Sequence, residues 1–442
     1  MTTFKPSRPK HHPRGASRRQ VLVGFGTGAV ALAGGRALAG SEGDEQVAVA
    51  PKGNADQLQR QSFYGIHQAG ITTARPAAGL VTAFDLIVQS PDDLETMLRL
   101  LTERISFLMH GGETPTADPK LPPPDSGILG PVIEPDNLTI TVSFGASLFE
   151  GRPWLAPLKP RQLVRMTQFP NDALDRDICH GDLAIQFNAN LQDTNIHALR
   201  DIVKNLSQFM VLRWSQEGSV PVAAPMEDGR EPTARNFLGF HDGSANPNST
   251  DTALMNEIVW VGPHNDEPEW AHGGTYQAVR IIRNFVERWD RTPLREQEEI
   301  FGRAKATGAP LGAGPGATEY DTPDYASDPD GAITPLDAHI RLANPRTRAS
   351  EENLILRRAF NYSNGVASSG QLDQGLLFIA YQADLEKGFI AVQNRLNGEP
   401  LEEYIKPVGG GYFYALPGVR DPGDYLGRSL VEAVRRRATS PS

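Results

Sequence analysis

The sequence predicts an α+β fold in which antiparallel sheets are covered by helices. Two observations support this: strand-like and helix-like segments alternate in both halves of the chain, and their spacing is irregular. A doubly wound sheet with a dinucleotide site would carry a glycine fingerprint between a strand and a helix, and none is present. The dense glycine cluster at 409–411 precedes a strand instead.

The first half opens with a strand followed by a helix. Residues 80–88 have the composition of a strand, and Ser90 then offers an N-cap before the first-turn proline Pro91. Asp92 and Asp93 favour the start of a helix that reaches about Met109.

The same order then repeats. A proline-rich loop around 121–124 leads to strands expected at 138–144 and 182–188. Six apolar residues next recur at helical spacing, which predicts a second helix with one buried face. They are Ile196, Leu199, Ile202, Val203, Leu206 and Phe209.

The second half shows similar alternation. Strands are expected at 257–261, 275–282, 375–381 and 412–416, with helices near Arg288 and from about Leu385 to Leu396. Residues 304–334 are rich in Gly, Pro and Asp without periodicity, which predicts a long surface loop, and such loops are often functional.

Composition excludes several classes of function. The 442 residues can bury a large core, and the formal charge of −10 is too acidic for a nucleic-acid binder. The single cysteine, Cys179, cannot form an internal disulfide, a cysteine-rich zinc site or an iron–sulfur cluster by itself. We expect this thiol to be inert.

The N-terminus is typical of an export signal. Six basic residues within 1–20 precede an apolar run at 21–35, which is shorter than the roughly 20 residues that span a bilayer. Arg18 and Arg19 match the twin-arginine pathway, and Ala37-Leu38-Ala39 predicts cleavage after residue 39. The alternative is a basic tail before a loose helix. Cleavage would change the net charge to −17, with 36 basic and 53 acidic residues, and a flexible lead-in at 40–62 would follow.

The histidines favour a macrocyclic cofactor over a multi-histidine metal site. Eight histidines lie beyond residue 39, and none forms a metal-chelating spacing. A haem needs only one axial histidine from the protein. The sequence lacks Cys-x-x-Cys-His, so any haem would be held non-covalently.

Two segments carry the residue types that such a site needs. Residues 236–247 contain Gly239-Phe240-His241-Asp242-Gly243, where glycines flank an acid and permit close backbone approach to a ligand. Residues 336–346 place His339 among arginines, and Arg357-Arg358 follow.

Together with three further segments in the same order, these motifs resemble the dye-decolourising peroxidase family, and most closely its twin-arginine-exported deferrochelatase/peroxidase branch. The further segments are Gly273 to Arg280, Pro323 to Pro329 and Tyr404 to Tyr412. The resemblance extends from about Phe63 to the C-terminus. It implies two ferredoxin-like halves, at 63–220 and 221–436, each an antiparallel sheet with covering helices.

The resemblance also implies one non-covalent haem b per chain, in a cavity of the C-terminal half. It makes His339 the proximal iron ligand, Asp242 the distal acid–base and Arg357 the distal cation. The remaining residues that it places around the haem are Gly243, Ser244, Ala245, Asn344, Pro345 and Arg346.

Each implied role has a physical reason. An ionised carboxylate at Asp242 can take a proton from hydrogen peroxide and return it to the outer oxygen as the O–O bond breaks. Arg357 would stabilise the charge on the departing oxygen. The second nitrogen of His339 would need an acceptor, for which Asp384 is a candidate, although helix N-capping explains Asp384 equally well.

Three neighbouring residues are expected beside the site or have two alternative roles. His241 occupies a variable position of the motif and is expected at the edge of the pocket. Arg341 and Arg358 pair either with surface acids or with the haem propionates.

The expected function is therefore peroxidation of dyes and other bulky reductants, together with release of iron from haem that leaves the porphyrin intact. A non-enzymatic haem-delivery protein is the alternative. The expected partners are hydrogen peroxide, bulky reductants or haem, components of an iron importer, and a second copy of the chain in a homodimer. We expect no nucleic acid and no membrane span after cleavage, and a location in the periplasm, or at the cell envelope where no outer membrane exists.

Overall fold

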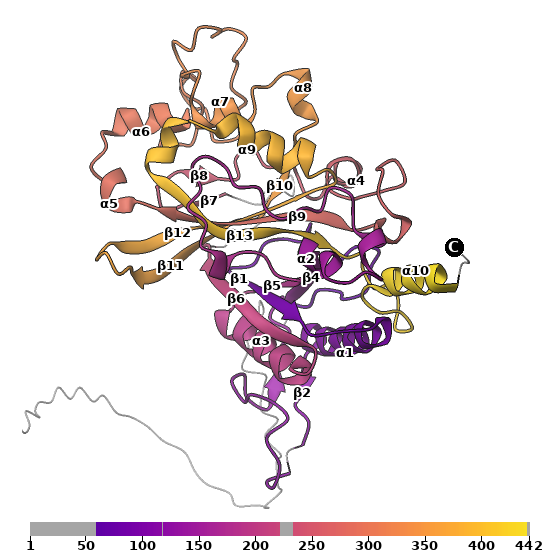
Figure 1. Cartoon of the computed structure of the whole chain (residues 1–442). Coiled ribbons are helices and arrows are strands. Elements are labelled where there is room, and N and C mark those ends of the chain that lie inside the picture. The colour runs from indigo at the N-terminus through magenta and orange to yellow at the C-terminus, as the bar shows by residue number, and fades with distance from the viewer. Residues whose placement is uncertain (1–58, 117, 222–232, 440–442) are drawn as a thin grey trace, which may run out of the picture. The chain divides into compact units, whose positions relative to one another are not determined.

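A computed structural model describes residues 59–116, 118–221 and 233–439 (Figure 1), which belong to one compact unit that begins at Gly53. The signal, its cleavage site and most of the lead-in lie outside the described residues. Within those residues, no helix is long and apolar enough to cross a membrane.

The secondary structure of the first half runs from β1 to β6. Its elements are β1 (Ala78–Leu86), α1 (Pro91–His110), β2 (Gly112–Glu113), β3 (Val132–Ile133), β4 (Thr139–Gly145), α2 (Ala146–Glu150), β5 (Leu183–Ala189), α3 (Gln192–Leu206) and β6 (Met210–Ser219). The long strands lie in the order β6-β1-β5-β4, all antiparallel. Strand, helix, strand, strand, helix, strand in this order is the ferredoxin-like arrangement.

The second half repeats that topology around longer connections. Its elements are β7 (Ala234–Arg235), β8 (His241–Asp242), α4 (Thr252–Ile258), β9 (Thr275–Asn284), α5 (Val286–Trp289), α6 (Leu294–Phe301), α7 (His339–Ala343), α8 (Arg348–Glu351), β10 (Leu356–Arg357), β11 (Phe360–Val366), β12 (Leu372–Gln382), α9 (Ala391–Leu396), β13 (Ile405–Ala415) and α10 (Arg428–Thr439). The long strands lie in the order β13-β9-β12-β11, again antiparallel. The predicted α+β fold of two ferredoxin-like halves is confirmed.

The two half-sheets join at both edges. β13 pairs with β4 and β11 with β6, so the eight long strands of the described residues form a closed antiparallel ring, to which β10 is added beside β12. Phe360 of β11 fills the space left by two glycines. A Cβ added at Gly79 of β1 or Gly218 of β6 would lie 2.5 or 2.7 Å from this side chain.

Helix α1 confirms the expected start signals. The Ser90 side chain accepts a hydrogen bond from the Asp93 amide at 3.1 Å, and Asp93 Oδ2 accepts one from the Ser90 amide at 3.0 Å. This reciprocal capping box satisfies donors that a helix N-terminus leaves free. On α1, Arg104 donates twice to Asp201 of α3, at 2.8 and 2.7 Å, which ties the two covering helices together.

The prediction was wrong at one element and incomplete at others. Residues 257–261 are not a strand: α4 covers 252–258, and the Asp251 side chain caps it by accepting from the Leu254 amide at 3.0 Å. A short apolar run does not distinguish a buried strand from a helix. Strands β6 and β11 and helices α6 and α10 were not predicted. Val203, assigned to a buried face of α3, is 38% exposed.

Candidate active site

The main functional candidate in the described part of the chain is a cavity between the second half-sheet and the helices α7 and α9. These helices lie together on one side of β9, β12 and β13 in Figure 1. It holds about 1800 Å³ that no protein atom fills, including its open mouth. Much of its wall is apolar. The strands contribute Ile282, Leu376 and Phe378, and the helical segments contribute Phe389, Val392 and Leu396.

An ion pair stands on the cavity wall. Arg357 Nη1 of β10 donates to Asp242 Oδ1 of β8 at 2.7 Å, and the two side chains are 28% and 15% exposed. A half-buried, charge-assisted hydrogen bond of this length fixes both groups more firmly than an exposed pair would. The structure therefore brings together two residues that the sequence identified separately.

The two glycines around Asp242 have a geometric reason. Gly239 and Gly243 adopt φ of 87° and 120°, which side chains rarely tolerate. A Cβ at Gly239 would also lie 2.6 Å from Lys305 Cε. The side chain of Asn236 accepts from the amides of Leu238 and Phe240 at 3.1 and 3.2 Å, which shapes the turn before β8.

Asn246 is a site residue that the sequence analysis missed. Its Nδ2 donates to the Arg357 carbonyl at 3.0 Å, and its Oδ1 accepts from the Arg357 amide at 2.8 Å. These two hydrogen bonds tie the segment after Asp242 to the β10 backbone and so help to hold Asp242 and Arg357 next to each other. In the sequence, the only feature that could have identified Asn246 is its position in the pattern Asp-Gly-x-x-Asn, which begins at Asp242.

His339 is the first residue of α7, on the same cavity. Its Nδ1 lies 2.7 Å from Glu399 Oε2, and the Glu399 side chain is 3% exposed. Burial opposes protonation of the imidazole, but the charge and hydrogen bond of Glu399 outweigh it and raise the pKa of His339. Because Glu399 engages Nδ1, Nε2 is the ring nitrogen left for the cavity. Arg395 of α9 donates to the carbonyls of Leu342 and Ala343 at 3.0 and 2.9 Å and so holds α7 in place.

The expectation that Asp384 accepts from His339 was wrong. Glu399 has that position, while Asp384 Oδ1 accepts from the Lys387 amide at 2.8 Å, at the start of the π-helical turn Glu386–Ile390. Asp384 is therefore a capping residue, the alternative that the sequence left open. Glu399 is 60 residues from His339 in the chain, and no local spacing connects the two.

The structure places most other expected residues on this wall. Gly243, Ser244, Ala245, Asn344 and Arg346 line the cavity, as does His241, whereas Pro345 is not among the lining residues.

The two arginines with alternative roles differ from each other. Arg341 pairs with Asp328 at 3.2 Å and lies outside the cavity lining, so the acid-pairing alternative holds for it. Arg358 is 3% exposed, which excludes a role as a surface residue.

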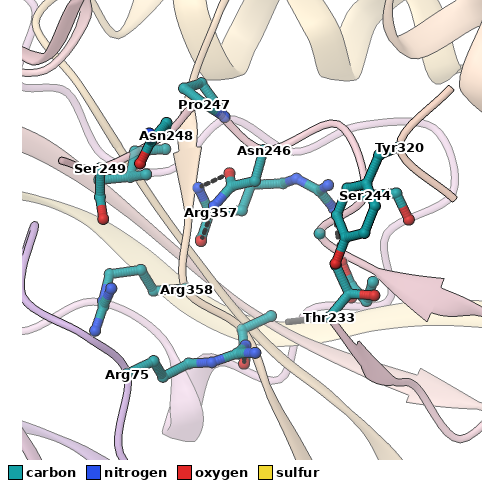
Figure 2. A pocket seen from close by; sticks show the side chains of 14 residues that line it. Arg75, Thr233, Ser244, Asn246, Pro247, Asn248, Ser249, Tyr320, Arg357 and Arg358 are labelled. Atoms are coloured by element: carbon teal, nitrogen blue, oxygen red, sulfur yellow. Dashed lines mark hydrogen bonds and ion pairs between the residues drawn. The ribbon is translucent and has the colours of Figure 1, made fainter. Parts of the chain in front are cut away.

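A smaller pocket adjoins the cavity (Figure 2). It holds about 620 Å³ of unfilled space, including its mouth, and shares Asp242, Gly243, Ser244, Pro247 and Arg357 with the larger one. Figure 2 shows Arg75, Thr233, Ser244 and Arg358 around it. The Asp242–Arg357 pair is therefore a partition between two spaces.

The residues of the cavity fit a haem. His339 offers one nitrogen for an axial bond, and the walls are apolar, as a porphyrin requires. Arg303 and Arg346 lie on the lining and suit the two propionates. Tyr325 Oη, also on the lining, is buried without a hydrogen-bond partner among the described residues, and burial raises its pKa to about 12, so it remains a donor.

A site in which protein side chains alone bind a metal is not apparent in the described ranges, because no group of three His, Cys, Asp or Glu residues there has a suitable arrangement.

Two family models match the chain. The Dyp-type peroxidase N-terminal model matches residues 68–219, and the C-terminal model matches residues 233–420. A curated protein of Escherichia coli O6:K15:H31, named deferrochelatase, is 55% identical over 416 residues, which cover 94% of this chain and 97% of that protein.

Solved structures show the same similarity. A DyP-type peroxidase from Cellulomonas bogoriensis has a TM-score of 0.74 at 33% identity, and ferric DtpA from Streptomyces lividans has 0.75 at 32%. Each comparison covers 86% of this chain and 100% of the other.

Proposed function

The chain belongs to the Dyp-type peroxidase family, and we propose from this premise that it is a haem b peroxidase of the deferrochelatase type. It is an enzyme, and its cofactor is non-covalently bound haem. Its proposed reactions are reduction of hydrogen peroxide with oxidation of bulky reductants, and release of iron from haem with the porphyrin intact. The 55% identity to a protein named deferrochelatase over nearly the whole chain supports the second reaction.

One observation carries the proposal: a carboxylate, a guanidinium and a histidine face one cavity, and each is fixed by a specific partner. Asp242 and Arg357 hold each other at 2.7 Å, and Glu399 holds His339 at 2.7 Å. A catalytic site of this kind depends on groups oriented before the reaction begins. The wall around these groups is largely apolar with a few polar side chains, as in most small-molecule sites.

The proposed roles follow from this geometry. When bound, haem supplies the iron that binds peroxide and exchanges electrons with it. Asp242 takes the proton from the inner peroxide oxygen and returns a proton to the outer oxygen. Arg357 stabilises the negative charge that develops on the leaving oxygen. His339 would hold the iron through Nε2, and Glu399, bonded to Nδ1, would fix the ring orientation and increase the basicity of the imidazole.

Iron release makes a second demand on the same cavity. When iron leaves a porphyrin, two protons must replace it on the ring nitrogens, so protons must be able to enter. Complete reduction of hydrogen peroxide to water by two electrons also consumes two protons, so both proposed reactions need protons from solvent. The ionisable side chains of the wall, Asp242 among them, are the candidates to supply it.

The location and assembly of the protein extend the proposal. The twin-arginine signal at 1–39 supports export to the periplasm or cell envelope, where released iron would pass to an importer. Two predictions remain untested: the domain limits at 63–220 and 221–436, and the homodimer. Gel filtration with light scattering measures the molar mass in solution and so tests the homodimer.

The deciding experiment compares two activities of the haem-loaded protein. Peroxide with a dye tests peroxidation by loss of dye absorbance. A reductant without peroxide tests iron release by the fluorescence of iron-free porphyrin, which iron quenches. Haem binding without either activity would support the alternative, a haem-delivery protein, and would contradict the proposal.

A further inference from the structure

A second histidine beside Asp242 is also held by a carboxylate. His241 Nδ1 lies 2.9 Å from Glu319 Oε2 and 2.7 Å from Thr233 Oγ1. Ser244 Oγ donates to the same Glu319 oxygen at 3.0 Å, and the Thr233 hydroxyl donates to it as well. We call His241, Thr233, Ser244 and Glu319 the Glu319 cluster.

The Glu319 cluster connects the two pockets. His241 lines the large cavity, Thr233 lines the smaller pocket, and Ser244 lines both. Figure 2 shows Thr233 and Ser244 on one side of the smaller pocket, beside Tyr320. Glu319 lies in neither lining and joins the three by hydrogen bonds. A continuous chain of donors and acceptors therefore runs from one space to the other.

The loop that supplies Glu319 is built to fit against His241. Arg303 Nη1 donates to the carbonyls of Gly308 and Glu319 at 2.7 and 2.9 Å. Gly308 has φ of 73°, and a Cβ there would lie 3.0 Å from the His241 ring and 2.7 Å from Glu319 Cβ. The side chains of His241 and Glu319 are 18% and 12% exposed. This part of the loop at 304–334, which the sequence placed at the surface, thus packs against His241.

The charges around His241 favour a neutral imidazole that can accept a proton. Burial is the main cause that lowers the pKa of His241, and the nearby charges of Arg235 and Arg303 lower it further. Glu319 acts in the opposite direction and raises it. Because the net effect lowers the pKa of His241, the imidazole is neutral and able to accept a proton at neutral pH. Asp242, the next residue on β8, borders the same cavity.

We propose that the Glu319 cluster relays protons between the smaller pocket and the large cavity, and that His241 is its proton-exchanging group inside the cavity. The inference rests on the proposed function, because complete reduction of hydrogen peroxide to water and release of iron from haem both consume protons there. The relay would deliver these protons from the smaller pocket, while Asp242 regains its ionised form by returning its proton to the outer peroxide oxygen.

The proton balance of the relay is simple. His241 Nε2 takes a proton from the cavity while the Nδ1 proton passes to Glu319 Oε2. The resulting carboxylic acid gives its proton to the hydroxyl oxygen of Ser244 or Thr233, whose own proton leaves to water in the smaller pocket. One proton enters, one leaves, and no electron moves. The reverse sequence brings a proton in.

The first test needs no haem. NMR titration of the haem-free protein measures the pKa of His241 in the wild type and in Glu319→Gln. Removing the carboxylate removes the cause that raises this pKa, so the titration midpoint should move to lower pH. Glu296→Gln, an exposed change on α6, is the control and should leave it unmoved. If Glu319→Gln left the midpoint unchanged, the relay would be overturned whatever the enzyme's activity.

The second test measures the peroxide reaction of the haem-loaded protein by stopped flow across pH. We expect Glu319→Gln and His241→Gln to bind haem normally and to slow this reaction about tenfold or more, with a changed pH profile. Glu319→Asp should recover part of the rate, because a carboxylate returns. Wild-type rate and pH profile in Glu319→Gln would refute the relay. A wild type that failed to react with peroxide would refute the proposed function instead, and the NMR titration would then decide on the relay alone.

Discussion

Arg357 Nη1 and Asp242 Oδ1 lie 2.7 Å apart, although 115 residues separate them in the chain. Asn246 binds both backbone groups of Arg357 and so links the two segments a second time. The pair borders both the large cavity and the smaller pocket. A carboxylate and a cation fixed in this way suit proton transfer and charge stabilisation at one peroxide molecule.

Arg357→Leu tests the cation. The variant should bind haem, since other residues form most of the cavity, but should react with peroxide slower by about 10²-fold or more, as for loss of one preorganised electrostatic group. Stopped-flow absorbance of the haem measures the rate. Arg161→Leu removes an arginine that is 63% exposed and is not a lining residue of the cavity, and this variant should react like the wild type. Wild-type speed in Arg357→Leu would show that the assigned role is wrong.

Glu399→Gln tests the partner of His339. Loss of the carboxylate should weaken haem binding roughly 10-fold to 100-fold, as for other residues that orient a metal-binding histidine, and His339→Ala should lose haem altogether. Titration with haem, followed by absorbance, gives the dissociation constants. Asp384→Asn is the matched control, because Asp384 caps a helical turn instead. Equal effects of Glu399→Gln and Asp384→Asn would argue against the assignment.

His67→Phe tests a pH dependence of stability in the haem-free protein. Burial lowers the pKa of His67, partly offset by its bond to the Gly273 carbonyl, so below about pH 6.5 the unfolded chain binds a proton that the folded chain lacks. The free energy of unfolding should therefore fall as pH decreases from 7 to 5. In the wild type the His67 ring stacks on Trp260 with 3.7 Å between the ring centroids. Phenylalanine should keep this stacking but has no group that titrates.

This variant should cost about 1 kcal/mol at pH 7.5 through the lost hydrogen bond. Its free energy of unfolding should also depend less steeply on pH, by up to about 1.4 kcal/mol per pH unit for one proton. Urea unfolding at a series of pH values measures both quantities. A slope equal to that of the wild type would contradict the account of His67.

Cys179 should be unreactive in the folded protein. Burial raises the pKa of its thiol to about 11, and the residue is 2% exposed, so the reactive thiolate is scarce at pH 8. Labelling with a thiol reagent at pH 8 should be far slower in the native protein than in urea. Equal rates in both states would show that the thiol is accessible.

The sequence was most informative where its signals are local. The capping pattern at Ser90 and Asp93 predicted α1, and the glycines around Asp242 predicted a tight approach of the backbone. The family resemblance added the assignments of Arg357 and His339. No local sequence pattern could have shown that these residues share a site with Asp242. It also added the ferredoxin-like halves, which periodicity alone left as alternating strands and helices.

What the sequence did not predict depends on contacts between distant segments. Glu399 and Asn246 act through partners 60 and 111 residues away. Glu319 lies in a loop without periodicity, so its contact with His241 left no pattern to read. The strand assigned at 257–261 was wrong because a short apolar run fits either conformation, and the Asp251 cap decided for a helix.

The most direct test of the central claim is the absorption spectrum of the haem-loaded protein before and after one equivalent of hydrogen peroxide. The account predicts a haem band that requires His339 and that changes within the mixing time of a stopped-flow instrument, with Arg357→Leu changing far more slowly. A protein that binds no haem, or whose haem spectrum is indifferent to peroxide, would contradict it.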